Sequence, residues 1–178
     1  MSGNPLELNT ACSLDDAGMC GCAGLFSDAS SDFRGTYLKP ILEKDPGDDV
    51  LAWGESLDHL LQCKTGQLLF EDFLRTEYSE ENLLFWLACE DYKTITSPAK
   101  MTVAAKKIYA EFVQVDAPKQ INIDCVTREE IRENLSQPVQ NCLDGAQRVI
   151  YSLMENDCYP RFLKSEMYQG LLEQAEQQ

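Results

Sequence analysis

The chain has 178 residues, of which 44% are hydrophobic, and its 15 basic and 30 acidic side chains give a formal net charge of −15. This length predicts one domain with a tail, and so acidic a balance excludes a nucleic-acid partner, whose binding needs clustered Lys and Arg. Simple adhesion to anionic lipid is excluded for the same reason. The acidity either favours a partner with a basic face or only keeps the chain soluble, and composition leaves both interpretations open.

Residues 1–48 are predicted to be a disordered tail and linker, because they are rich in small and polar residues and show no sustained hydrophobic period. Cys20 and Cys22 interrupt this tail beside apolar residues. S-acylation of this pair would add membrane affinity, and two unmodified exposed thiols are the alternative. The Cys-x-Cys spacing, with the single histidine His59 far away, does not predict a zinc site. We therefore expect no metal or other cofactor.

The eight cysteines are expected to be reduced thiols, because no N-terminal run has the pattern of a secretory signal. No stretch approaches the about 20 apolar residues of a membrane span. We therefore expect a cytoplasmic protein, with recruitment to the inner face of the plasma membrane if the tail is acylated.

Residues 49–178 are predicted to form one all-α domain of about nine helices, because apolar residues recur there at helical spacing and no strand period is evident. Segments 50–61, 68–74, 79–93, 98–117 and 144–159 each show such a stripe. Leu68, Leu69, Phe73 and Leu74 mark the second of these helices. The residues predicted to share one face or to face inward in the other helices outside the central segment are Leu57, Leu60, Leu61, Met101, Ala105, Ile108, Phe112, Val115, Ala146, Val149, Ile150 and Leu153.

Several helix starts carry capping signals. Ser97 followed by Pro98 is typical of an N-cap and a first helical position. Thr127 with Glu at 130, and Asp144 with Gln at 147, have the spacing of capping boxes. Pro160 is expected to end or kink the helix that precedes it, and a last helix is expected to begin near residue 165.

Residues 77–90 join an acidic loop to an abrupt apolar helix start. Ser79 is predicted to be the N-cap, with Glu80 and Glu81 where the helix dipole favours negative charge. Residues 83–87 are all apolar, which predicts a deeply buried helix with Trp86 in a structural role. Asn82 stands where a capping box would have Glu or Gln, so it is either a spare polar residue of a plain helix start or a group presented to a partner.

Catalytic groupings are scarce in this sequence. There is no Gly-rich phosphate loop, and one histidine among scattered cysteines does not make a nucleophile pair. The polar residues at loop–helix junctions instead indicate a binding module, because such positions are rigid and can form hydrogen bonds. These residues are Glu77, Tyr78, Ser79, Asn82, Asn122, Asp157 and Arg161.

The block at 77–90 resembles the central motif of regulator of G-protein signalling (RGS) domains. The likeness continues through residues 53–57, 70–74, 121–124, 127–130 and 159–165, in the order and roughly the spacing of that family, and it covers the chain from about Val50 to about Ala175. It is closest to the short, single-domain members. The resemblance implies two packed subdomains, one of them an antiparallel four-helix bundle. It also implies a monomeric GTPase-activating protein, without catalysis of its own, for GTP-bound Gα subunits of the Gi and Gq classes.

The resemblance further implies a surface that grips the switch regions of Gα. In the family the amide matching Asn82 approaches the catalytic glutamine of Gα. The carboxylate matching Asp157 accepts a hydrogen bond from a switch-region backbone donor and is held by the arginine matching Arg161. Cys158 stands where the family commonly has Ser, and its weaker donor is expected to lower affinity or alter Gα preference. The implied contact residues are Glu77, Tyr78, Ser79, Glu81, Asn82, Asn122, Leu153, Asp157, Cys158 and Arg161.

Two other functions stay open at this point. One is a non-catalytic helical adaptor whose acidic surface docks a basic protein partner, and such an adaptor would tolerate Asn82→Ala and Arg161→Ala. The other is an RGS-like fold that binds Gα without accelerating hydrolysis. The intact set of Asn82, Asn122, Asp157 and Arg161 argues against the second.

Overall fold

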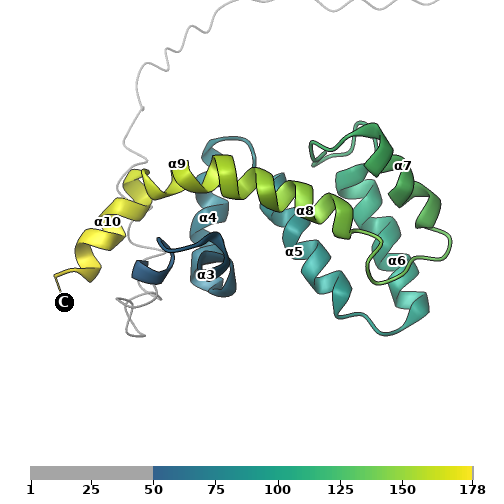
Figure 1. Ribbon diagram of the computed structural model, residues 1–178, viewed down its shortest axis with the longest axis horizontal. Coiled ribbons are helices and arrows are strands. Elements are labelled where there is room, and N and C mark those ends of the chain that lie inside the picture. Colours follow the sequence, from purple (N-terminus) through teal and green to yellow (C-terminus); the bar gives the residue numbers. More distant parts are fainter. Residues whose placement is uncertain (1–49, 178) are drawn as a thin grey trace, which may run out of the picture. The chain divides into compact units, whose positions relative to one another are not determined.

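The computed structural model describes residues 50–177, and every regular element among them is helical (Figure 1). The all-α prediction is therefore confirmed. None of these helices is long and apolar enough to cross a membrane. The predicted tail and linker at 1–48, with Cys20 and Cys22, lie outside the described residues. The elements are α3 (Leu57–Gln62), α4 (Lys64–Thr76), α5 (Glu81–Lys93), α6 (Pro98–Ile108), the π-helical segment η1 (Tyr109–Val113), α7 (Cys125–Asn134), α8 (Asp144–Leu153), the π-helical segment η2 (Met154–Cys158), α9 (Tyr159–Leu163) and α10 (Glu166–Ala175).

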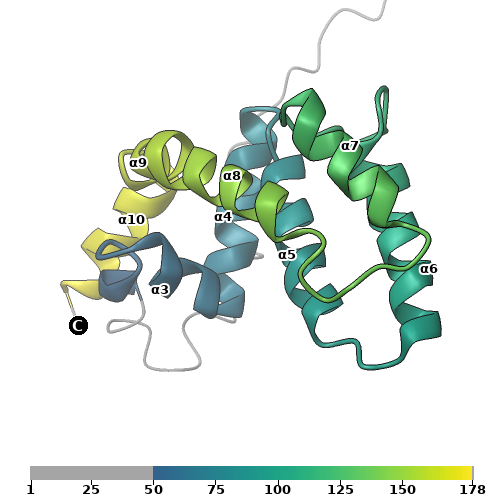
Figure 2. The same cartoon turned by 45° about the vertical axis from the view of Figure 1, so that its right-hand side comes forward.

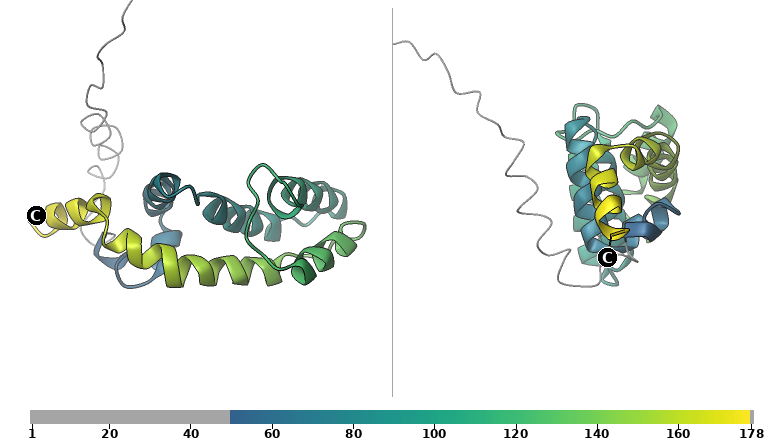
Figure 3. Two further views of the ribbon diagram at one scale, coloured as in Figure 1. Left: turned by 90° about the horizontal axis from the view of Figure 1, so that it is seen from above. Right: turned by 90° about the vertical axis from the view of Figure 1, so that its left-hand side faces the viewer.

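Two groups of helices make up the described part of the chain. In one group α5 packs against α6 and α8, and α7 packs against η1 and α8. The short connection 94–97 reverses the chain, so α5 and α6 run side by side in opposite directions (Figure 2). In the other group α3 packs on α4, and α10 packs on α9. One helical path of α8, η2 and α9 joins the two groups (Figure 3).

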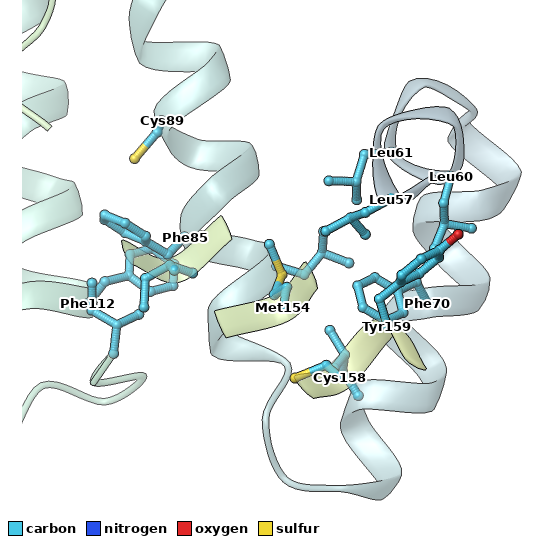
Figure 4. Close-up of a cluster of buried hydrophobic side chains, with 14 of the residues drawn as sticks. Leu57, Leu60, Leu61, Phe70, Phe85, Cys89, Phe112, Met154, Cys158 and Tyr159 are labelled. Atoms are coloured by element: carbon cyan, nitrogen blue, oxygen red, sulfur yellow. The ribbon is translucent and has the colours of Figure 1, made fainter. Parts of the chain in front are cut away.

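A continuous apolar core fills both groups (Figure 4). On one side Phe85 of α5 packs on Phe112 of η1, with ring centroids 5.8 Å apart. On the other side Phe162 of α9 lies edge-on to Phe70 of α4, at 5.3 Å. The buried side chain of Met154 lies between these two clusters. The core therefore fixes η2 and α9 against the end of α4, where the predicted contact loop begins.

The helix predicted over 50–61 is interrupted. Residues 50–52 are helical, a turn follows, and α3 begins after Ser56, whose hydroxyl accepts the His59 N–H at 3.2 Å. The Tyr168 hydroxyl lies against Gly54 and donates to the Val50 carbonyl at 3.0 Å, so the C-terminal helix holds this turn in place. The three leucines predicted to share one face of α3 are nevertheless buried. In α4, Leu69, Phe73 and Leu74 are buried and Leu68 is exposed.

The predicted stripe of the helix after Pro98 fails at its end. Val115 is 64% exposed, and Val113 takes the buried position instead. The reason is that the helix ends with η1: Gln114, the next residue, has an extended backbone with ψ 157°, so Val115 lies in a turn beyond the helix. Helix α6 itself begins at Pro98 with Ser97 as the N-cap residue, as expected, although the Ser97 side chain forms no capping bond.

Both predicted capping boxes are wrong. Asp124, not Thr127, is the N-cap of α7, and its carboxylate accepts the Thr127 N–H at 2.9 Å. Leu143 precedes α8, so Asp144 is already inside the helix. Gln147 is 5% exposed and donates from Nε2 to Glu90 at 2.7 Å. It faces inward because Glu90 and the Trp86 carbonyl satisfy its amide, while the predicted inward residue Val149 is exposed.

Candidate functional site

The connection between α4 and α5 is a tight turn that presents Tyr78 to solvent. The backbone N–H groups of Glu77 and Ser79 both donate to the Leu74 carbonyl at 3.0 Å, which closes the end of α4. Tyr78 has a φ of 54°, a left-handed conformation that few residues with a side chain adopt. Its side chain is 92% exposed. The turn therefore places a large aromatic ring on the surface beside the acidic residues of the loop.

Ser79 does not cap α5. Glu80 is the N-cap residue and forms no side-chain capping bond, while the Ser79 hydroxyl donates backwards to the Leu74 carbonyl at 3.4 Å. The Ser79 carbonyl accepts the Asn82 N–H at 3.3 Å and so begins the helix with a tight turn. The prediction of an Ser79 N-cap is wrong because the turn at Tyr78 directs the hydroxyl towards the end of α4.

Asn82 is buried rather than presented at the surface. Its side chain is 4% exposed, and Nδ2 donates to the Ser79 carbonyl at 3.1 Å and to Oε1 of Glu81 at 3.4 Å. Its Oδ1 is buried and has no hydrogen-bond partner within the described part of the chain. Burial is the main cause that raises the pKa of Glu81, with a smaller contribution from the charge of Glu80. This first turn therefore holds an acceptor whose hydrogen-bonding capacity is unmet.

Arg161 joins this loop to the other end of the site. Its Nε and Nη2 donate to the two carboxylate oxygens of Glu77, each at 2.9 Å, and its Nη1 donates to Asp157. The hydrogen bonds that Arg161 donates to Glu77 and then to Asp157 raise its pKa, so it stays charged at every physiological pH. We call Glu77, Asp157 and Arg161 the ion-pair cluster. It connects two segments that lie 84 residues apart in the sequence.

In the π-helical segment η2, successive residues face either the surface or the core. Asp157 is exposed, whereas Cys158 is buried beside Met154. Burial raises the pKa of the Cys158 thiol above its ordinary value. Leu153, at the end of α8, is partly exposed. Cys158 therefore packs beneath the surface that Asp157 and Arg161 form.

Asn122 lies in the segment 114–124 between η1 and α7. Its side chain is exposed, while its neighbours Ile121 and Ile123 are buried. The Ile121 N–H donates to the Phe112 carbonyl at 2.9 Å, which ties the segment to the end of η1. Because α5 and α6 run in opposite directions, this segment lies at the end of the α5–α8 helix group where α5 begins (Figures 1 and 2).

The predicted site residues thus lie near the start of α5, but only some of them are linked to one another directly. Hydrogen bonds directly link Glu77, Asp157 and Arg161, and a second set links Ser79, Glu81 and Asn82. Tyr78 adjoins both sets through the backbone, and Asn122 reaches the same end of the α5–α8 helix group from its own segment.

Arg128 is a residue of this region to which the sequence pattern assigns no role. In the structure its Nε donates to the Val113 carbonyl at 2.8 Å, and its Nη2 donates to the Ile123 carbonyl at 3.2 Å. The signal was its place in the motif at 127–130, four residues after Asp124.

Comparison with known proteins identifies a family for this architecture. Residues 56–171 match the family described as "Regulator of G protein signaling domain". The chain is 48% identical over 162 residues to "Regulator of G-protein signaling 8" of Danio rerio, covering 88% of this chain and 92% of that protein. It is 47% identical over 159 residues to the protein of that name from Homo sapiens, covering 88% of each. It is 52% identical over 135 residues to "Regulator of G-protein signaling 5" of Sus scrofa, covering 75% of each.

Proposed function

Because the chain belongs to the regulator of G protein signaling domain family, we propose that it is a GTPase-activating protein for heterotrimeric G-protein α subunits. By speeding the return of Gα to its GDP form, it would end signalling from G-protein-coupled receptors. The observation that carries this proposal is the ion-pair cluster, which fixes polar side chains from two distant segments on one surface. A surface whose side chains are already ordered can bind a partner with little entropic cost.

The proposed mechanism leaves the chemistry to Gα and gives this chain no catalysis of its own. Gα subunits carry an arginine in cis and a glutamine that orients the attacking water. A helper accelerates hydrolysis if it binds the transition-state arrangement of the switch regions more tightly than the ground state. Each tenfold acceleration needs a difference of about 1.4 kcal/mol in those two binding free energies.

We propose different roles for the two amides of the site. Asn122 is exposed, so its side chain is free to reach the switch regions and the glutamine of Gα. Asn82 is buried and holds the Ser79 carbonyl, but its unpaired Oδ1 offers an acceptor to a donor that arrives with Gα. Asn82 therefore combines a contact with support of the loop that carries Tyr78.

The remaining contacts are proposed as one surface on a domain that spans residues 49–178. Tyr78 supplies exposed apolar area, Glu81 and Asp157 supply acceptors, and Cys158 supports them from beneath. The partners are GTP-bound Gα subunits of the Gi and Gq classes, each engaged by a monomer of this chain. S-acylation of Cys20 and Cys22 would hold the protein at the inner face of the plasma membrane, where Gα resides.

Single-turnover GTP hydrolysis by purified Gα subunits tests this proposal. A stoichiometric excess of the full chain should raise the hydrolysis rate of at least one Gi-class or Gq-class subunit, and the chain alone should hydrolyse no GTP. Unchanged rates across the panel would overturn the proposal. In that case the acidic adaptor would be the alternative function. It predicts that the Asn82→Ala and Arg161→Ala variants bind the basic protein partner as tightly as the wild type does.

Calorimetry tests the mechanism separately from the rate. Gα loaded with GDP and aluminium fluoride mimics the transition state, and it should bind this chain more tightly than Gα loaded with GDP alone. Equal dissociation constants for the two forms would contradict preferential binding of the transition state.

A further inference from the structure

We propose that Arg128 is a positioning residue for GTPase activation, because its guanidinium ties together the two ends of the segment that carries Asn122. This inference rests on the proposed function and deepens it by naming the side chain that orders this segment. Arg128 would not touch the α subunit itself. It would act through the placement of the Asn122 amide.

The segment needs such a support because it has no regular secondary structure. After η1 the chain turns into an extended conformation at Gln114 and passes through a positive φ of 60° at Asp116. Bonds within the segment and to η1 order its first half, among them the Asp116 N–H to Oε1 of Gln120 at 2.7 Å. The backbone N–H of Lys119 donates to the Glu111 carbonyl at 3.1 Å. Segments of this kind open more easily than helices, so their geometry depends on specific anchors.

The second half is anchored from two sides. Ile121 and Ile123 insert into the core, and Asn122 between them is exposed to solvent. The Ile121 N–H is bonded to Phe112, but the Ile123 carbonyl and the Val113 carbonyl at the end of η1 need other partners. Without a donor from the protein, these two carbonyls would have to find a hydrogen bond from water at the edge of the core.

Arg128 supplies both donors from the first turn of α7. Its Nε bonds to the Val113 carbonyl at 2.8 Å and its Nη2 bonds to the Ile123 carbonyl at 3.2 Å. Arg128 forms no ion pair with any residue described in the structure, so its side-chain hydrogen bonds go to these two carbonyls. A charged donor forms a stronger bond than a neutral one, and the guanidinium fork spans two acceptors in a fixed plane.

The start of α7 holds Arg128 itself in place. The Asp124 carboxylate accepts the Thr127 N–H at 2.9 Å and the Thr127 hydroxyl at 2.7 Å. The next backbone N–H, that of Arg128, donates to the Asp124 carbonyl at 3.2 Å. Asn122 is therefore fixed by a short chain of contacts from a capped helix. A displacement of about 1 Å in such a group can reduce a rate by about a hundredfold.

The test compares Arg128→Lys with Arg132→Lys in the full chain. Lysine keeps the charge but loses the planar fork. Arg132 lies one turn later on α7 and pairs with Glu129 at the surface, so its replacement controls for a changed arginine on this helix. In single-turnover assays R128K should reduce the acceleration of Gα by about tenfold or more, and R132K should leave it unchanged. Circular dichroism at the assay temperature should show that both variants are folded. If R128K does not fold, Arg128→Gln takes its place.

A double-mutant cycle with Asn122→Ala separates positioning from general stability. If Arg128 acts through Asn122, R128K should reduce activation little further once Asn122 is absent. If the losses of activation from R128K and N122A simply add in the double mutant, the inference is overturned. It is also overturned if either single variant activates Gα as fully as an active wild type does. If the wild type accelerates no α subunit, the proposed function fails and this inference falls with it.

Discussion

The guanidinium of Arg161 forms two parallel hydrogen bonds, each 2.9 Å long, with the carboxylate of Glu77. This bidentate pair is the direct link between the loop after α4 and the helical path that leads from α8 into α9. Because both side chains are partly exposed, the pair organises the surface more than it stabilises the fold.

Replacement of Arg161 by Met should abolish most GTPase activation with little loss of stability. The substitution frees Glu77 and Asp157 to move and leaves two carboxylates without a counter-charge. Exposed ion pairs contribute about 0–1 kcal/mol, so the melting temperature should change little. Single-turnover rates and thermal melts on the same protein test this, with Arg132→Met as the control for an exposed arginine. Wild-type acceleration by R161M would remove the ion-pair cluster from the functional site.

Asn82→Ala and Asn122→Ala should differ in their effect on stability. Asn82 is buried and bonded to Ser79, so its loss should lower the free energy of unfolding by about 1 kcal/mol or less and reduce activation. Asn122 is exposed, so N122A should reduce activation at an unchanged melting temperature. Urea unfolding and single-turnover assays on both variants separate these outcomes. If N82A is destabilised but fully active, Asn82 serves only its own helix.

Phe85→Ala should be more destabilising than Trp86→Ala. Phe85 is fully buried against Phe112, and large-to-small changes at such sites cost about 3–5 kcal/mol. Trp86 is only partly buried at the edge of the core, so part of its surface already contacts water and its truncation should cost less. Denaturant midpoints of the two variants, measured at one protein concentration, provide the comparison. A larger loss for W86A would show that the two faces of α5 are wrongly assigned.

Asp124→Asn should flatten the acid side of the stability profile. The hydrogen bonds from Thr127, backbone first and hydroxyl second, lower the pKa of Asp124 from its ordinary value of 3.8. A lowered carboxylate pKa adds stability above pH 3.8, and that contribution is lost as the pH falls through the folded-state pKa. Asn caps helices as Asp does but does not titrate. The difference in melting temperature between wild type and D124N should therefore shrink from pH 7 to pH 3. A constant difference would contradict this account.

Hydrophobic patterning along the chain is enough to predict the fold class and most of the core. Buried residues such as Leu57, Phe73 and Ile150 follow from hydrophobic periodicity, because each helix must place its apolar stripe towards the core. The motif at 77–90 and its companions also sufficed to indicate the family. These features are local in sequence, so no knowledge of distant contacts was needed to find them.

Which residues of the site lie at the surface, and which support them from below, depends on the packing of separate segments. The helix after Pro98 ends with η1 and leaves Val115 in an exposed turn, while Cys158 is buried at the end of η2. The positive φ at Tyr78 turns Ser79 away from the start of α5, and the pairing of Arg161 with Glu77 needs two segments brought together by the core. The bond from Arg128 to the Val113 carbonyl likewise joins residues 15 positions apart in the sequence. Periodicity and capping rules describe neighbours along the chain, whereas these interactions depend on how separate segments pack in space.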